Sequence, residues 1–137
     1  MSVHESAPRR RVLIVDDEES MRLILARMLS EEGGVEVQLA GTCEQALRLL
    51  QNCAYDAILL DVLMPGIGGI GVLRELRASS PNARTPVIIV SVIAEKATMD
   101  RCRAAGANAY LVKPVERSEL LKTLRAQLAA PQRPTAQ

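Results

Sequence analysis

The sequence predicts an α/β domain in which helices cover both faces of a doubly wound, five-stranded parallel sheet. Short aliphatic runs alternate strictly with longer segments whose apolar residues recur at helical spacing. Three of these runs are almost wholly aliphatic, which is typical of strands covered on both faces. Because strands that alternate with helices imply right-handed crossovers, the sheet is expected to be parallel.

We expect one domain over residues 11–129, with disordered tails at 1–10 and 130–137. The expected strands are RVLIV (11–15), VEVQLA (35–40), AILL (57–60), VIIV (87–90) and AYLV (109–112). The chain has no Phe or Trp and two Tyr among 137 residues, so its core must be aliphatic. This composition also argues against stacking on nucleic-acid bases.

The segments between the strands carry apolar residues on one helical face. The inward sets are Met21, Ile24, Leu25, Met28 and Leu29; Ala46, Leu47, Leu49 and Leu50; Ile70, Leu73 and Leu76; and Leu120, Leu121, Leu124 and Leu128. Thr42 and Gln45 match a capping box. The Gly33-Gly34 pair is expected to end the first helix and Gly106 the fourth, and a last helix is expected from about Glu116 to Ala129.

Composition excludes several classes of function. Cys43, Cys53 and Cys102 are odd in number and widely spaced, which argues for a reducing compartment and against a disulfide framework or a zinc site. His4 is the only histidine and lies in the expected tail, so no buried imidazole base is available. No apolar run is long enough to span a membrane and no signal peptide is evident, so we expect a soluble cytoplasmic protein.

Polar residues follow four of the five expected strands. Asp16 and Asp17 follow the first, Asp61 the third, Ser91 the fourth and Lys113 the fifth. These positions share the sheet edge at which ligands of such folds bind. Two unit charges ~4 Å apart repel by ~4 kcal/mol at an effective dielectric near 20, so three clustered carboxylates call for a cation. Mg²⁺ suits them, and the lysine and serine suit a phosphoryl group.

Each of these residues also has an ordinary structural interpretation. Asp17 or Glu18 could cap the first helix, Ser91 could cap the fourth, and Lys113 could be a surface lysine before a proline turn. Their joint placement at the ends of four strands favours a functional site over these separate roles.

A glycine motif suggests a competing function. Gly66, Gly68 and Gly71 have the G-x-G-x-x-G spacing of a dinucleotide-binding turn. Such a turn has its first glycine directly after a strand and an acid ending the next strand, whereas here a Met-Pro pair intervenes and the next strand ends in serine. We instead expect Gly66, Gly68 and Gly69 to turn the chain beneath the acidic site with positive φ values.

Four motifs together make the chain similar to the receiver domains of two-component response regulators, of the chemotaxis-regulator type. They are VLIVDDEES (12–20), DVLMPGIGG (61–69), VIIVS (87–91) and GANAYLVKP (106–114). The resemblance extends from about Arg11 to Leu128 and implies a flavodoxin-like fold with strand order 2-1-3-4-5.

The resemblance also implies roles for individual residues. Asp61 would accept the phosphoryl group, and Mg²⁺ would be bound directly by Asp17, Asp61 and the carbonyl of Leu63, with Asp16 acting largely through water.

Ser91 and Lys113 would contact the phosphoryl group, and the Lys113-Pro114 bond would be cis. Tyr110 would be the switch aromatic that turns inward as Ser91 moves. A structural alternative for Tyr110 is an ordinary core or half-exposed tyrosine.

The function implied is phosphorelay signalling. A sensor histidine kinase or a histidine phosphotransfer protein would phosphorylate Asp61, and the surface of the fourth helix, fifth strand and fifth helix would change. The domain would not be an enzyme beyond its own phosphoryl transfer and autodephosphorylation. No nucleic acid or membrane is expected as a partner, and the switched surface could support a homodimer. No recognisable output segment follows the last helix, so we expect either a stand-alone regulator or an excised domain of a longer protein.

Two rival functions fit the sequence less well. A phosphohydrolase of the haloacid dehalogenase type needs a second Asp two residues after its nucleophile, and Leu63 occupies that position. A receiver-like domain that no longer takes phosphate would be expected to lack one of the required side chains, but all are present. Val92 replaces the small residue that is usual after the hydroxyl position in the family, and its bulk predicts slower phosphorylation by small donors. Leu63 and Ile93 are apolar and lie beside the expected path of an attacking water, which predicts slow self-dephosphorylation.

Overall fold

The computed structural model describes residues 9–130. Its elements are β1 (Arg10–Val15), α1 (Glu19–Ser30), β2 (Val35–Ala40), α2 (Cys43–Asn52), β3 (Ala57–Leu60), α3 (Gly68–Ala78), β4 (Val87–Ser91), α4 (Lys96–Ala104), β5 (Ala109–Val112) and α5 (Arg117–Ala129). The strands form one sheet in the order β2-β1-β3-β4-β5, with every pair parallel. The predicted architecture and strand order are therefore confirmed. Apart from Arg9, Arg10 and Ala130, the expected tails lie outside the described residues.

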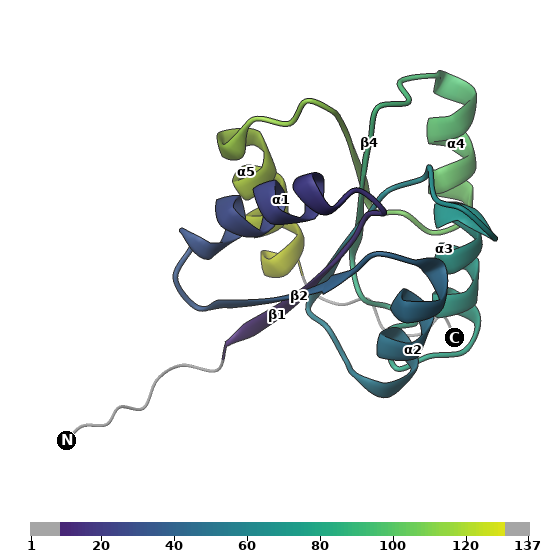
Figure 1. The fold of residues 1–137 in the computed structure, drawn as a ribbon, viewed down its shortest axis with the longest axis horizontal. Coiled ribbons are helices and arrows are strands. Elements are labelled where there is room, and N and C mark those ends of the chain that lie inside the picture. Colours follow the sequence, from purple (N-terminus) through teal and green to yellow (C-terminus); the bar gives the residue numbers. More distant parts are fainter. Residues whose placement is uncertain (1–8, 131–137) are drawn as a thin grey trace.

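The molecule has three layers (Figure 1). Helices α1 and α5 cover one face of the sheet, and α2, α3 and α4 cover the other. Every residue of β3 and β4 is buried, as expected for central strands covered on both faces. None of the described helices has the length and apolarity that crossing a membrane requires.

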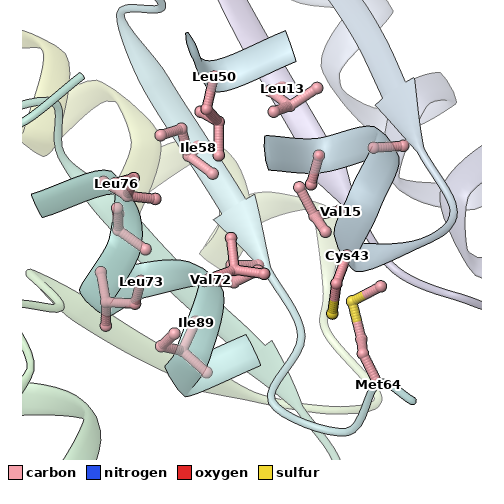
Figure 2. Packing of buried hydrophobic residues seen from close by; sticks show 14 of the residues in the cluster. Leu13, Val15, Cys43, Leu50, Ile58, Met64, Val72, Leu73, Leu76 and Ile89 are labelled. Carbon is pink, nitrogen blue, oxygen red and sulfur yellow. The ribbon is translucent and has the colours of Figure 1, made fainter. Parts of the chain in front are cut away.

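The sheet separates two aliphatic cores because successive strand residues point to opposite faces. Leu13 of β1 and Ile58 of β3 belong to the core beneath α2 and α3, together with Leu50 and Leu73 (Figure 2). The alternate strand residues, among them Ile14, belong to the core beneath α1 and α5. This packing fixes β1 and β3 side by side and therefore fixes which residues meet where these strands end.

Two expectations for the first helix were wrong. Helix α1 ends at Ser30, where the Glu32 N–H turns back to the Leu29 carbonyl, and the Gly33-Gly34 pair lies in the following turn. Ile24 was expected to point inward, but 47% of it is exposed. The buried Leu25 defines the inward direction, and one step along a helix rotates a side chain by roughly 100° away from it.

The start of α2 and the end of α4 were predicted more accurately. The Thr42 hydroxyl accepts a hydrogen bond from the Gln45 N–H at 3.0 Å, as a capping box requires. The Gln45 side chain departs from that motif, because it accepts from the Gly41 N–H instead of the Thr42 N–H. Gly106, with a φ of 111°, follows the last residues of α4 as expected.

A fully buried asparagine joins the α2–β3 and α3–β4 connections at the amino ends of the strands, opposite the acidic site. The Asn82 carbonyl Oδ1 accepts hydrogen bonds from the Tyr55 N–H at 2.7 Å and from the Thr85 hydroxyl at 3.1 Å. Its Nδ2 donates to the carbonyls of Leu50 and Cys53 at 2.8 and 2.7 Å. Asn82 is 0% exposed, so all its polar atoms are satisfied inside the protein.

Candidate functional site

A buried lysine joins two carboxylates at the carboxyl edge of the sheet. The Lys113 ammonium, directly after β5, lies 2.8 Å from Oδ2 of Asp16 and 3.0 Å from Oδ2 of Asp61. Asp16 follows β1 and Asp61 follows β3, so the sheet order itself brings the three residues together. Their side chains are at most 6% exposed, which excludes the interpretation of Lys113 as a surface lysine. Burial lowers the pKa of Lys113, but the hydrogen bonds to Asp16 and Asp61 and the negative charges of these residues together outweigh burial, so this pKa is raised.

The two buried carboxylates have further hydrogen-bond partners. Oδ1 of Asp16 accepts from the Glu18 N–H at 2.9 Å, and Oδ1 of Asp61 accepts from the Leu63 N–H at 3.1 Å. Both aspartates are therefore fixed by Lys113 on one oxygen and by backbone on the other.

Asp17 adds a third carboxylate. One oxygen each of Asp16, Asp17 and Asp61 lie within 4.8 Å of one another, and Asp17 alone of the three is exposed. Three carboxylates against one ammonium leave two negative charges (−3 + 1 = −2). A hard divalent cation with oxygen ligands fits both this charge and this donor set.

Ser91, the last residue of β4, lies fully buried at the same edge. Its carbonyl accepts from the Lys113 N–H at 2.8 Å, and its hydroxyl accepts from the Ile93 N–H at 3.2 Å. It does not cap α4, whose N-cap residue is Glu95. The N-cap of α1, Glu18, likewise makes no side-chain cap bond. The Lys113-Pro114 bond is cis, as predicted.

Tyr110 lies half-buried beside the loop that follows Ser91. Its hydroxyl donates to the Ile93 carbonyl at 2.6 Å. Burial raises the pKa of Tyr110, and a hydrogen bond with Ser91 partly offsets this. Ser91 and Tyr110 thus both hold the backbone of Ile93, one at its N–H and one at its carbonyl.

Three exposed apolar side chains occupy the loops next to the acidic residues. Leu63, Ile67 and Val92 are 50%, 53% and 59% exposed, respectively. Leu63 lies two residues after Asp61, and Val92 directly follows Ser91. The edge therefore combines buried charged groups with apolar residues in the adjoining loops.

The glycines after Asp61 have two different roles: two adopt positive φ values, and one allows two backbone segments to approach closely. Gly66 and Gly68 have positive φ values of 89° and 77°, as predicted. Gly69 does not, and that expectation was wrong. A Cβ on Gly69 would lie 2.0 Å from the Asp61 carbonyl oxygen, so this residue allows α3 to begin directly against the end of β3.

Sequence reasoning missed one residue that contacts this site. Arg22 of α1 donates from Nη1 to the Asp16 carbonyl at 2.7 Å. An arginine on an amphipathic helix usually indicates a solvated side chain, so only its position six residues after Asp16 could have suggested this contact.

A family comparison now assigns the class of protein. The sequence model of the response regulator receiver domain matches residues 12–125, which is most of the chain. The chain therefore belongs to the receiver domain family.

Curated relatives carry the same domain within longer proteins. The sensory/regulatory protein RpfC of Xanthomonas campestris is 38% identical over 116 residues, which are 83% of this chain and 16% of RpfC. The transcriptional regulatory protein PdtaR of Mycobacterium tuberculosis is 38% identical over 120 residues, 88% of this chain and 57% of PdtaR. The match thus spans 16% of the length of RpfC and 57% of the length of PdtaR, so the chain corresponds to only part of each relative.

Solved structures agree with the fold over their whole length. The receiver domain of a sensor histidine kinase from Pseudomonas aeruginosa, with magnesium coordinated in its active-site cleft, has a TM-score of 0.82 at 32% identity. The match covers 89% of this chain and 99% of that domain. Chemotaxis protein CheY4 of Vibrio cholerae has a TM-score of 0.81 at 32% identity, over 86% of this chain and 98% of CheY4.

Proposed function

We propose that this domain accepts a phosphoryl group on Asp61 from a sensor histidine kinase or a histidine phosphotransfer protein. The observation that carries the proposal is the contact of the Lys113 ammonium with both Asp16 and Asp61, beside a third carboxylate. A charge cluster of this kind at the carboxyl edge of a parallel sheet is suited to a phosphoryl group and its counterion.

Asp61 is the nucleophile in this proposal. One of its carboxylate oxygens attacks the phosphorus of a phosphohistidine, the new P–O bond forms, and the P–N bond breaks as the imidazole leaves. The Lys113 ammonium contacts Oδ2 of Asp61, and the Leu63 N–H contacts Oδ1. Each carboxylate oxygen keeps a further lone pair that is available for the attack. In this proposal Lys113 neutralises charge on the transferred phosphoryl group, and the Ser91 hydroxyl donates a hydrogen bond to it.

Magnesium is the cofactor that we propose. Asp17, Asp61 and the Leu63 carbonyl would hold it directly, and Asp16 largely through water. When bound, Mg²⁺ would neutralise the clustered carboxylates and the phosphoryl oxygens. The protein's own part is to hold Asp16 and Asp61 in place through Lys113 and the backbone N–H groups.

We propose the surface of α4, β5 and α5 as the one that phosphorylation changes. If the Ser91 hydroxyl turns toward a phosphoryl group, its bond with the Ile93 N–H is lost. The loop is then held by Tyr110, which would turn inward with it. Helix α4 buries only Thr98 and Cys102 among its residues, so few packing contacts oppose its movement. A homodimer through this surface is one readout of the switch.

The proposal is tested by incubating the chain with Mg²⁺ and a small acyl phosphate and measuring its intact mass. We expect the mass of one phosphoryl group to appear on the wild type and to be absent from Asp61→Asn. Asp100→Asn removes an exposed carboxylate that pairs with Lys96 and should behave as the wild type. An unphosphorylated wild type, or a phosphorylated Asp61→Asn, would refute the proposal. Beryllofluoride titration with a measurement of self-association would then test the switch.

Leu63→Asn is expected to shorten the lifetime of the acyl phosphate by roughly tenfold, equivalent to ~1.4 kcal/mol in the hydrolysis barrier. The half-exposed leucine lies two residues from Asp61 and gives an attacking water no polar partner, whereas an amide can orient one. The loss of mass is followed over time after removal of the donor. Leu63→Ala controls for reduced bulk, and an unchanged half-life in Leu63→Asn would contradict this expectation.

Val92→Ala is expected to speed phosphorylation by small acyl phosphates by roughly threefold, or ~0.65 kcal/mol. Val92 directly follows Ser91 and its side chain is exposed, so we infer that it narrows the approach to Asp61. Initial rates with and without the substitution measure this effect at a fixed donor concentration. Equal rates would show that Val92 does not restrict entry.

A further inference from the structure

Arg22 lies where the hydrogen bonding between β1 and β2 ends. The Asp16 N–H donates to the Ala40 carbonyl at 3.1 Å, and β2 ends at Ala40. The Asp16 carbonyl is therefore beyond the last backbone pair of the two strands. It accepts from Nη1 of Arg22 at 2.7 Å, so the guanidinium takes the place of a further strand donor.

The guanidinium lies directly against Gly41, the residue after β2. A Cβ on Gly41 would stand 2.7 Å from Nη1, 3.1 Å from Cζ and 3.3 Å from Nη2 of Arg22. Real Cβ atoms are essentially never as close as 2.7 Å to another heavy atom, so any larger residue at this position must displace the arginine head group. The Gly41 N–H is itself held by Oε1 of Gln45. The position of the guanidinium thus depends on the absence of a side chain at Gly41.

The carbonyl that Arg22 holds belongs to the peptide unit between Asp16 and Asp17. A peptide unit is planar, so fixing its carbonyl also fixes its N–H and the direction in which Asp17 continues. The direction of the backbone matters more for Asp17 than for the other two aspartates of the cluster, because none of the described residues holds its side chain. Within residues 9–130, the Asp17 carboxylate makes no hydrogen bond or ion pair, whereas Asp16 and Asp61 are each held by Lys113 and a backbone N–H.

We propose that Arg22 is a positioning residue for the divalent cation site: by holding the Asp16 carbonyl in the space left open by Gly41, it sets the orientation of Asp17. This inference rests on the proposed cation site and adds a determinant of its affinity. Groups that orient metal ligands without touching the metal typically change metal affinity by ~10–100-fold when they are removed.

The positive charge of Arg22, taken alone, predicts that removing this residue would strengthen cation binding. Arg22 forms no ion pair with a described carboxylate, so removing it removes a positive charge from the neighbourhood of the acidic cluster. If the charge were its only influence, Arg22→Met would bind cations more tightly. Positioning predicts weaker binding. The sign of the change therefore separates the two effects.

The test is calorimetric titration of the full chain with Mg²⁺ alone, for the wild type, Arg22→Met, Arg22→Lys and Gly41→Ala. We expect the dissociation constant to rise about tenfold in Arg22→Met, at the lower end of such effects. Gly41→Ala keeps the charge but displaces the guanidinium, and should show a similar rise. Arg22→Lys, which keeps a charge and a donor, should recover most of the affinity.

The double variant and a matched control complete the design. Arg22→Met combined with Gly41→Ala should weaken Mg²⁺ binding no further than either change alone, because both changes remove the same contact, that of the Arg22 guanidinium with the Asp16 carbonyl. Arg27→Met, an exposed arginine on the same helix, should bind Mg²⁺ as the wild type does. Unchanged or tighter binding in Arg22→Met, or wild-type affinity in Gly41→Ala, would overturn the inference. A wild type that binds no Mg²⁺ would overturn both the inference and the proposed cofactor.

Discussion

Replacing Asn82 by alanine is expected to lower the free energy of unfolding by about 3–5 kcal/mol. The substitution removes four hydrogen bonds at a position that is 0% exposed. It leaves the Tyr55 N–H and the carbonyls of Leu50 and Cys53 without this partner, and a buried unsatisfied polar group costs ~1–3 kcal/mol. Urea unfolding with linear extrapolation measures the loss.

Two variants make the Asn82 prediction specific. Asn52→Ala removes an exposed asparagine that donates to the Arg48 carbonyl and should cost less than about 1 kcal/mol. Asn82→Asp keeps the shape but turns a charged oxygen toward the carbonyls of Leu50 and Cys53, so it should be as damaging as alanine at neutral pH. Its deficit should shrink on acidification, since a protonated carboxyl can donate to one carbonyl. Equal stability of Asn82→Ala and the wild type would contradict the prediction.

Gly69→Ala is expected to destabilise the domain by at least about 3 kcal/mol and to weaken Mg²⁺ binding by more than about tenfold. The added Cβ would meet the Asp61 carbonyl oxygen at 2.0 Å, and the Asp61 carbonyl carbon and Val62 Cα at 2.8 Å. These are backbone atoms, so relief requires α3 to move away from the end of β3. That movement would also break the bond from the Gly69 N–H to the Val62 carbonyl and would shift Asp61.

Thermal unfolding and Mg²⁺ titration of the same samples test the Gly69 prediction. Gly33→Ala is the matched control, because its Cβ would meet nothing within 4 Å and its φ is not positive. That control should be neutral or more stable by up to ~1 kcal/mol. A Gly69→Ala variant with wild-type stability and affinity would show that the loop relaxes freely.

The fold was predictable because its signals are local. The runs at 57–60 and 87–90 are aliphatic throughout, and both proved to be wholly buried central strands. The site followed from them, since the order of parallel strands determines which strand ends are neighbours. Asp16, Asp61 and Lys113 were predicted together for this reason, although Lys113 is 97 residues from Asp16 along the chain.

Contacts that depend on packing were not predictable. Asn82 stands in the stretch SSPNART, where an asparagine usually indicates an exposed turn, and its burial arises from connections 27 to 32 residues away. Gly69 carries the same letter as the positive-φ glycines before it, yet its function is close backbone contact. The sequence showed which residues carry the charge of the site, but not those that hold them in place.

Because the core lacks Phe and Trp, the near-ultraviolet absorption and fluorescence of the domain come from its two tyrosines. Tyr55 lies just before β3, at the amino ends of the strands, and its hydroxyl donates to the Gln38 side chain at 2.5 Å. The Tyr110 hydroxyl instead donates to the Ile93 carbonyl, in the loop that follows β4. In a Tyr55→Phe background, intrinsic fluorescence would come from Tyr110 alone. The molecule thus carries its own optical reporter of that loop, without an attached dye.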